Sequence, residues 1–338
     1  MRRLARLAAA LAAFVAAVLA LAVAAGAGGA PSGLPLREIG RMPLPGPAVR
    51  FDYTALDPST GLLWIAHMNA SELLAVDVKK RRVVHAIPAP RVHGVIAVPA
   101  LGRVFASATD ARQAWTIDAR SGKVLARADA GRYPDGLAWD AKTRRVFVSD
   151  ESGGVETVLD AKGRKIATID LGGEAGNVQS DPVSGLVLAD VQTRNDIAVI
   201  DPRRLKVVRR IPVPGCDADH SLLLDAPHRL AFVACEGNAR LVVIDLRTEK
   251  AVGGDRVGGS PDVLAFDPGI GRGRLYVSAE SGDVAVFQET AHGAKRLGLA
   301  HLADAAHTVA VDPVTHRVYF PLERGNGGDP QLLVLLPT

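Results

Sequence analysis

Residues 220–261 read HSLLLDAPHRLAFVACEGNARLVVIDLRTEKAVGGDRVGGSP, and this stretch decides the fold. It holds three short apolar runs, at 220–224, 230–235 and 241–244, and a weaker, more polar run at 251–257. Clusters rich in Asp, Pro, Gly and Asn separate the runs. Short runs of Val, Leu, Ile and Phe between such clusters are typical of β-strands joined by tight turns. No run has the length or the 3.6-residue spacing of a helix, so the stretch predicts four consecutive strands.

The same unit recurs along the chain. Its opening positions, most of them polar, follow one another at intervals of 41 to 45 residues. They are Asp52, His93, Asp135, Gly176 with Asn177 beside it, His220, Asp262 and His307. An Asp stands five residues after six of these seven openings, where a turn is expected to begin. Units of about 40–45 residues with four short strands are typical of propeller blades, so the sequence predicts an all-β, seven-bladed β-propeller.

The two ends of this repeat region complement each other. The last copy, at 307–338, has only three strand-like runs before the chain ends. Residues 36–46 precede the first opening and include RMPLPG, which resembles RIPVPG at 210–215, the end of a fourth strand. The N-terminal strand at 36–46 should therefore complete the blade at 307–338 and close the ring, which removes an exposed sheet edge. We expect one propeller domain over 36–338.

The N-terminus has the composition of an export signal. Three arginines within the first six residues precede an Ala-, Leu- and Val-rich run at 7–25, and Ala25-Gly26-Ala27 fits a small-x-small cleavage site. This pattern predicts a signal peptide at 1–27 and a short linker at 28–35. The alternative is an uncleaved membrane anchor, which the length of the run permits. We expect a periplasmic or secreted protein without a membrane span after cleavage.

The charge of the chain argues against nucleic acid as a partner. The formal net charge is +4, from 40 Lys and Arg against 36 Asp and Glu. Three of the basic residues lie in the predicted leader, so the rest of the chain carries 37 against 36 and is nearly neutral. A charge-driven attraction to DNA or RNA is therefore not expected. A closed ring has no strand edge that must pair, so we expect a monomer.

Two second-strand segments indicate a family. Phe147-Val148-Ser149-Asp150 and Tyr276-Val277-Ser278-Ala279 are degraded forms of a Tyr-Val-Thr-Asn motif, and an apolar strand, Asp, turn and Ile-Pro pattern follows at 74–88 and 197–212. In these features the chain resembles the YncE-like, or YVTN-repeat, seven-bladed propellers of exported bacterial proteins, over nearly all of 36–338. The resemblance implies the fold rather than an activity. Members include proteins with no known catalysis, some implicated in binding, and related propellers include metal-dependent lactonases and streptogramin lyases.

The blade repeat places the opening residues together. The first strand of each propeller blade lines the central channel, and the connections that enter first strands lie on one face, called the top. The openings should therefore form a ring around the channel mouth, with three imidazoles and three carboxylates in one layer. The ends of the second strands would add His67, Asp150, Glu151, Asp190, Glu236, Glu280 and Glu323.

Two interpretations of this ring remain open. The side chains either cap neighbouring backbone groups and bind channel water, or hold a ligand. Imidazole together with carboxylate suits Zn²⁺, Cu²⁺, Ni²⁺ or Fe²⁺, whereas oxygen ligands alone would favour Ca²⁺. The predicted ligands of a divalent metal ion of unknown identity are His93, His220, His307, Asp52, Asp135 and Asp262. The residues predicted to contact another ligand are His67, Asn177, Glu151, Glu236 and Glu280.

The favoured function is non-catalytic binding of a metal, a small molecule or a protein at the top of the channel. The alternative is a metal-dependent hydrolase or lyase, similar to lactonases or streptogramin lyases, that uses the same ring. The metal would then polarise a carbonyl or activate water, and His307 or Glu323 would handle a proton. The sequence contains no nucleophile elbow, Walker loop or dinucleotide fingerprint.

The two cysteines flank one of the predicted metal ligands. Cys216 precedes His220 in the loop that enters the fifth blade, and Cys235 ends the second strand of that blade. A disulfide between them is expected in an oxidising compartment, and the alternative is a buried free Cys235 with an exposed Cys216. Five histidines fall at turns or outer strands and are expected to face solvent, namely His85, His228, His292, His301 and His316.

Overall fold

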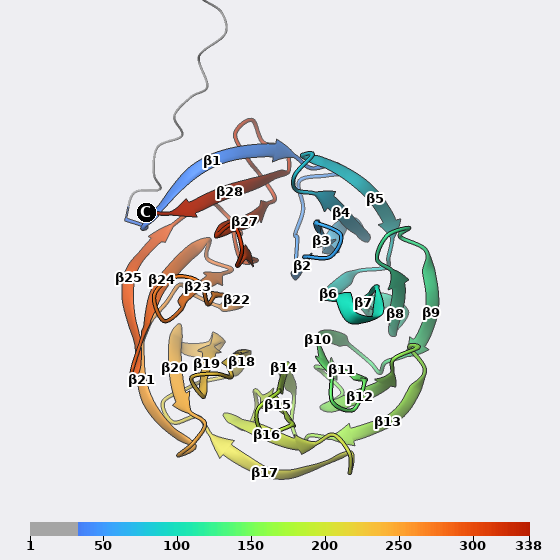
Figure 1. Cartoon of the computed structure of the whole chain (residues 1–338), viewed down its shortest axis with the longest axis vertical. Coiled ribbons are helices and arrows are strands. Elements are labelled where there is room, and N and C mark those ends of the chain that lie inside the picture. The colour runs from blue at the N-terminus through green and yellow to red at the C-terminus, as the bar shows by residue number, and fades with distance from the viewer. Residues whose placement is uncertain (1–32) are drawn as a thin grey trace, which may run out of the picture.

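The computed structural model describes residues 33–338, which form a ring of seven four-stranded antiparallel sheets (Figure 1). The predicted seven-bladed propeller is therefore confirmed. The predicted signal peptide at 1–27 lies outside the described residues, as does most of the predicted linker at 28–35. Over residues 33–338, no helix is long and apolar enough to cross a membrane.

The strands follow the chain blade by blade. The first three blades hold β2 (Thr54–Asp57), β3 (Leu62–His67), β4 (Glu72–Asp77), β5 (Arg82–Pro88); β6 (Val92–Val98), β7 (Arg103–Ala108), β8 (Gln113–Asp118), β9 (Val124–Asp129); and β10 (Pro134–Asp140), β11 (Arg145–Asp150), β12 (Val155–Asp160), β13 (Lys165–Asp170). The next three hold β14 (Ala175–Asp181), β15 (Leu186–Val191), β16 (Asp196–Asp201), β17 (Lys206–Pro212); β18 (Asp219–Asp225), β19 (Leu230–Cys235), β20 (Arg240–Asp245), β21 (Lys250–Arg256); and β22 (Pro261–Asp267), β23 (Arg274–Ala279), β24 (Asp283–Thr290), β25 (Gly293–His301). The last blade holds β26 (Ala310–Asp312), β27 (Arg317–Leu322), β28 (Gln331–Pro337) and β1 (Leu36–Pro43). Short 3₁₀ turns are η1 (Met68–Ala70), η2 (Pro99–Leu101), η3 (Thr109–Ala111) and η4 (Glu236–Asn238).

The ring closes through its two ends, as predicted. Strand β1 pairs antiparallel with β28, from Leu36 opposite Pro337 to Pro43 opposite Gln331. Figure 1 shows this N-terminal strand in blue beside the red C-terminal strand, on the outside of the last blade. The strand ends at Pro43 rather than at 46, because prolines that follow lack the N–H that a ladder needs.

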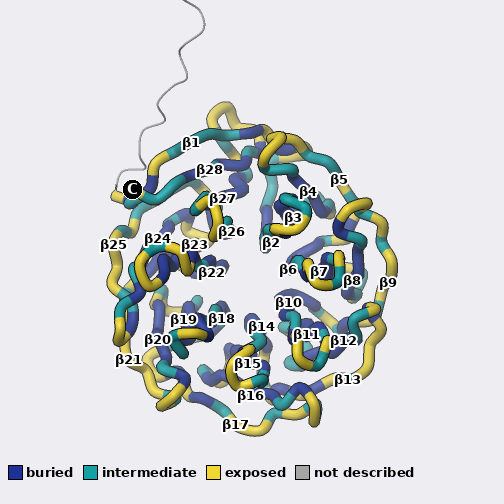
Figure 2. Tube along the Cα trace, viewed as in Figure 1, coloured by how far each residue is buried: buried dark blue, intermediate teal, exposed yellow. Residues whose placement is uncertain are grey.

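The apolar core lies between neighbouring blades. One cluster, for example, joins Trp64 and Leu73 of the first blade to Val104 and Trp115 of the second. The second and third strands supply most of the buried side chains, whereas the outermost strand of each blade is largely exposed (Figure 2). Each blade buries its faces against two neighbours, so the ring shape follows from the alternating apolar pattern of short strands.

The first strands are irregular at the top of the ring. In five blades the pairing register shifts at the start of the first strand, and the opening residue lies within this bulge. A bulge turns a side chain away from its regular direction, which aims these residues toward the channel. Asp52 and His307 lie in loops instead, because β2 begins at Thr54 and β26 at Ala310. The expectation of a first strand from residue 307 is therefore wrong.

The turns at the bottom of the blades share one geometry, which comes from the Asp that ends most first strands. Each of these six Asp side chains accepts a backbone N–H from the turn that follows, and they are Asp57, Asp140, Asp181, Asp225, Asp267 and Asp312. Such Asx-type contacts favour a tight turn over continued strand. This explains why the sequence repeats Asp at this position.

Candidate functional site

Serine hydroxyls of neighbouring strands hold the opening residues in place. Ser107 Oγ on β7 donates to the carbonyl of Asp135 at 2.8 Å, and Ser278 Oγ on β23 donates to the carbonyl of His307 at 2.7 Å. Both hydroxyls are buried and come from the preceding blade. Because each bond crosses a blade boundary, the main chain of the opening residue is fixed before any ligand arrives.

The top of the channel contains a cavity of about 200 Å³. The opening residues that line it are Asp52, His93, Asp135, His220 and Asp262. The predicted ligand-contacting residues Glu151, Glu236 and Glu280 also line it. The rest of the wall consists of Arg50, Tyr53, Met68, Arg91, Tyr133, Ser260 and Pro261. The wall holds six carboxyl groups, two guanidinium groups and two imidazoles, so a ligand here meets groups of both charges.

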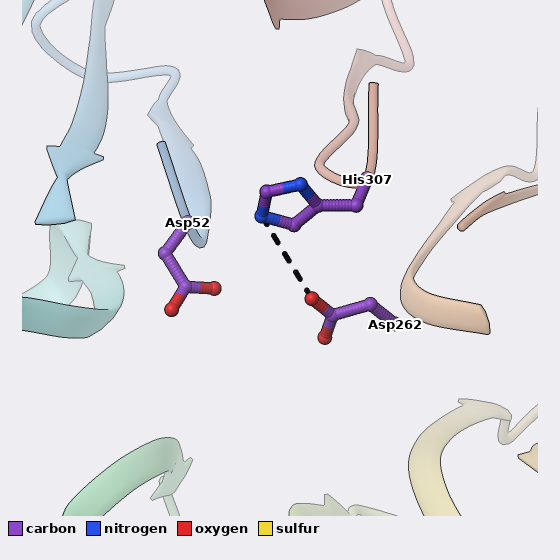
Figure 3. Close-up of side chains that lie close together, drawn as sticks. All are labelled: Asp52, Asp262 and His307. Carbon is purple, nitrogen blue, oxygen red and sulfur yellow. Dashed lines mark ion pairs between the residues drawn. The ribbon is translucent and has the colours of Figure 1, made fainter. Parts of the chain in front are cut away.

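Three side chains from separate loops and strands converge beside this cavity. One ligand atom each from Asp52, Asp262 and His307 lies within 4.8 Å of the other two, and all three residues are buried. Figure 3 shows the two carboxylates and the imidazole directed toward one another, with His307 Nε2 at 3.9 Å from Asp262 Oδ2. Among residues 33–338, neither Asp52 Oδ1 nor His307 Nε2 has a hydrogen-bond partner.

The tautomer of His307 makes this cluster a set of acceptors. His307 Nδ1 lies 3.0 Å from the carbonyl oxygen of Ala305, which can only accept, so Nδ1 carries the proton. In the neutral ring, Nε2 then presents its lone pair to the two carboxylates. Converging acceptors repel one another unless a proton or a cation lies between them, so these residues can share a proton or hold a divalent metal ion.

The other two histidines of the predicted ring have different partners. His93 Nε2 lies 3.1 Å from the hydroxyl of Tyr133 and 3.9 Å from Asp52 Oδ2. Burial lowers the pKa of His93 to about 4, so its ring is neutral at physiological pH. His220 Nε2 lies 3.5 Å from Asp262 Oδ1. Burial opposes the charge of His220, but Asp262 and the nearby acids outweigh it and raise its pKa to about 10, so this ring is a cation.

The acids of the cavity divide into two kinds. Burial, together with Asp262 and Asp135, raises the pKa of Asp52 well above its usual range. Burial and the neighbouring Glu151 raise the pKa of Asp135 to about 7. Asp262 is the exception, because the hydrogen bond and the charge of His220, together with Arg50, overcome the effect of burial and lower its pKa. Of these three acids, Asp262 is therefore the one that is ionised most readily.

Four of the predicted ligand-binding, metal-binding and catalytic residues lie outside the cavity wall. His67 is fully buried, stacks on Phe51 with ring centroids 4.1 Å apart, and places Nε2 at 3.1 Å from the carbonyl of Pro47. Asn177 accepts a hydrogen bond from the hydroxyl of Tyr53 at 2.9 Å and lines the channel below the cavity. The predicted catalytic residue Glu323 is half-buried, with a raised pKa that burial causes. His307 adjoins the cavity through Asp262 and is not part of its wall.

Sequence reasoning missed the basic and aromatic residues of the wall. Arg50, Arg91, Tyr133 and Ser260 each stand two residues before an opening position. Arg50 pairs with Asp262 at 3.2 Å and also with Glu280. These residues follow the same repeat spacing as the openings, so the position two residues before each opening is the sequence signal for them.

Cys216 and Cys235 form a disulfide with Cα atoms 5.3 Å apart. Cys235 lies opposite Asp219 in the β18–β19 ladder, directly beside His220. The disulfide therefore ties the loop that enters the fifth blade to the second strand of that blade, next to the cationic histidine.

Comparisons with known proteins support the fold and do not identify a family. No protein-family model and no curated protein matches the sequence. Among solved structures, the chain is similar to hydrazine synthase of Kuenenia stuttgartiensis, with a TM-score of 0.70 and 14% sequence identity. The match covers 87% of this chain and 96% of that one. At this identity the likeness supports the propeller architecture and carries no statement about activity.

Proposed function

We propose that this chain is an exported propeller of the YncE-like type that binds a divalent metal ion through Asp52, Asp262 and His307. The observation that carries the proposal is the convergence of these three buried residues, with ligand atoms within 4.8 Å of one another. Two of those residues have an atom without a hydrogen-bond partner. A buried acceptor without a donor costs free energy, and a metal ion would remove that cost.

The donor set suggests the class of metal. One imidazole nitrogen and two carboxylates suit Zn²⁺ and its transition-metal neighbours better than Ca²⁺ or Mg²⁺, which prefer oxygen ligands. His220 contacts Asp262 Oδ1, and Arg50 contacts Asp262 Oδ2, the oxygen that faces His307, so both side chains orient this carboxylate. The cavity of about 200 Å³ above the cluster offers room for a small polar or cationic molecule beside the metal.

Metal analysis tests this proposal. The purified protein is dialysed against Zn²⁺ and then against buffer, and its metal content is measured. We expect His307→Ala to hold one equivalent of Zn²⁺ less than the wild type, because the removed imidazole supplies the only nitrogen of the three ligands. His301→Ala is the matched control, because His301 is half-exposed on the outermost strand of the sixth blade. Equal metal content in the wild type and in His307→Ala would contradict the proposal.

A second candidate function is metal-dependent hydrolysis or elimination at the same place. The observation that favours it is Asp135, whose pKa of about 7 is that of a general base at neutral pH. Asp135 lies in the same cavity wall as Asp52 and Asp262. A screen of lactones and phosphotriesters with the zinc-loaded protein tests this function, and Asp135→Asn should abolish any turnover found. Turnover that survives in Asp135→Asn would exclude this residue as the base.

Export and the monomeric state belong to the same proposal. The leader pattern at 1–27 and the disulfide between Cys216 and Cys235 support an oxidising, extracytoplasmic location. Expression with the leader intact, followed by cell fractionation and N-terminal sequencing, tests it. A mature protein that begins near residue 28 and elutes as a monomer is the expected result, and an unprocessed cytoplasmic chain would contradict it.

A further inference from the structure

A second cluster of potential metal ligands lies at the bottom of the ring, between the fifth and sixth blades. Asp225 is the last residue of β18, His228 stands in the turn that follows, and Glu289 comes from β24 of the next blade. His228 Nδ1 lies 2.7 Å from Asp225 Oδ2 and 3.0 Å from Glu289 Oε1. One ligand atom from each of the three lies within 4.8 Å of the other two. The expectation that His228 simply faces solvent is therefore wrong.

Glu289 is the member of this cluster that a structural role does not explain. Its side chain is fully buried, and within residues 33–338 its carboxylate has two neighbouring donors, His228 Nδ1 at 3.0 Å and Arg272 Nε at 3.4 Å, neither of which makes a well-aligned hydrogen bond with it. Turn formation accounts for Asp225, which accepts the backbone N–H of His228, but nothing similar accounts for Glu289. A buried carboxylate without a well-aligned donor is costly unless it is protonated or meets a cation.

The sixth blade differs from the others at this point. Its third strand, β24, has eight residues, whereas the third strands of the first five blades have six. The pairing places Gln288 opposite Arg274, at the position where the fifth blade pairs Asp245 with Leu230. Glu289 therefore lies in an extension of the hairpin, and this extension brings it against the turn of the fifth blade.

The charges around the cluster leave room for a divalent cation. Arg272 Nε lies 3.4 Å from Glu289 Oε1, and its side chain is 45% exposed. Arg247, which is more exposed, donates to the carbonyl of His228 rather than to a carboxylate. In the form that binds a metal, with a neutral imidazole and both carboxylates ionised, Asp225, Glu289 and Arg272 together carry one net negative charge. His228 is the partly exposed member at 34%, so an ion can enter from the solvent side.

We propose that Asp225, His228 and Glu289 bind a second divalent metal ion of the zinc type, which ties the fifth blade to the sixth. Imidazole with two carboxylates suits such an ion, and water on the solvent side would complete the tetrahedral shell. This site is separate from the cluster at the top of the channel and shares no residue with it. Its role is structural, because the ligands come from two neighbouring blades, and the ion would add to the ion pairs His220–Asp262 and Arg296–Asp255 that already join them.

The neighbouring blade boundary supplies a matched control. His316 Nδ1 lies 2.8 Å from Asp267 Oδ2, between the sixth and last blades. This pair has the same Nδ1-to-carboxylate contact as His228 and Asp225, although it joins two blades and not two residues of one turn, and within residues 33–338 no third carboxylate joins it in a metal-like group. Removal of His316 should therefore leave metal content unchanged.

The test uses the full chain with His307→Ala, so that the proposed top site cannot contribute. Zn²⁺ is added, excess is removed by dialysis, and bound zinc and Tm are measured. We expect about one equivalent of zinc and a rise in Tm of several degrees, because an ion that binds only the folded chain stabilises it. The nearly isosteric change Glu289→Gln should lower the zinc content to zero and abolish the rise in Tm. The change His316→Ala in the same background should retain both.

Two results would overturn this inference. One is a His307→Ala protein that holds no zinc and shows no change in Tm. The other is zinc content that Glu289→Gln leaves unaltered. If the top site does not bind metal, the wild type and His307→Ala will hold the same amount of zinc, and Glu289→Gln will still remove it. Failure of the proposed function is thus distinguishable from failure of the bottom site.

Discussion

The two ends of the propeller channel use the same residue types in opposite ways. At the bottom, the Asp residues that end the first strands accept backbone N–H groups from tight turns, and Asp181 also receives Arg229 at 2.7 Å. At the top, Asp52 and Asp135 have buried carboxylate oxygens with no hydrogen-bond partner. The pKa of Asp181 is lowered, whereas the pKa values of Asp52 and Asp135 are raised.

This difference separates carboxylates that stabilise the fold in their charged form from those that can serve a ligand. Asp225, which accepts a backbone N–H and also lies beside His228 and Glu289, is the exception at the bottom. A carboxylate with several donors stabilises the folded chain in its charged form, and its removal leaves donors unpaired. A buried carboxylate without donors destabilises the folded chain until a cation or proton arrives. Repetition along the sequence does not distinguish the two kinds, because both stand at fixed positions of the blade repeat. Their hydrogen-bond partners do.

The largest effect should come from opening the ring, which holds the two faces in register. Deletion of residues 36–46 removes β1 and exposes the edge of β28. We expect loss of a single cooperative unfolding transition and a large drop in Tm, since the last blade would lose its fourth strand. Thermal melts followed by circular dichroism measure this. An unchanged Tm would show that the pairing of β1 with β28 contributes little.

Removal of a carboxylate at the bottom of the ring should have the second largest effect on stability. Asp181→Ala should lower the free energy of unfolding by about 3 kcal/mol, because it leaves the buried Arg229 without its partner. Urea denaturation measures the change. Asp312→Ala is the matched control, since this more exposed Asp caps only its own turn and should cost about 1 kcal/mol. Equal losses in the two variants would show that the Arg229 contact is weak.

The pH dependence of stability should differ in sign between the two faces. Asp135 has a pKa of about 7 in the folded chain against 3.8 ordinarily, so stability falls as pH rises from about 4 to 7, by up to about 1.4 kcal/mol per pH unit. Asp181 has a lowered pKa, so its contribution is present at neutral pH and is lost as pH falls below about 4.

Denaturation curves across this pH range test the sign. Asp135→Asn should flatten the decline between pH 4 and 7, and Asp181→Asn should flatten the acid limb instead. A variant that flattens the wrong limb would contradict the division between the two faces.

The smallest effect on stability is expected at the proposed metal site itself. Asp52→Asn replaces a buried carboxylate that lacks donors with a neutral amide, so stability without metal should change by less than about 1 kcal/mol or rise. The same change should weaken Zn²⁺ binding by at least about 100-fold, as measured by calorimetric titration. A strongly destabilised Asp52→Asn protein would place Asp52 among the structural carboxylates.

Most of the fold could be predicted from the sequence, because each blade carries its own copy of the repeat pattern. Turn-forming Asp, apolar strands and a spacing of 41 to 45 residues are local features, so blade number and ring closure could be predicted from them. The first residue of strand β26 could not be predicted in this way. The carbonyl of His307 accepts a hydrogen bond from Ser278 of the neighbouring blade and does not pair with strand β27. That contact joins residues 29 positions apart and leaves no local pattern.

The candidate site was only partly predictable. The spacing brought Asp52, Asp262 and His307 to one layer, but it could not separate the roles of the three histidines. Those roles depend on single contacts across the channel, such as Tyr133 to His93 and Asp262 to His220. His67 has the right place in the repeat, yet it turns toward Pro47 and Phe51, because the N-terminal loop passes beside it. Glu289 was missed because it belongs to an extension that breaks the repeat.

Anomalous diffraction from crystals of the zinc-loaded protein tests the central claim most directly. The account predicts a zinc peak at the top of the channel, about 2.0–2.2 Å from His307 Nε2 and from carboxylate oxygens of Asp52 and Asp262. Zinc-loaded crystals with no peak between these three residues would contradict it.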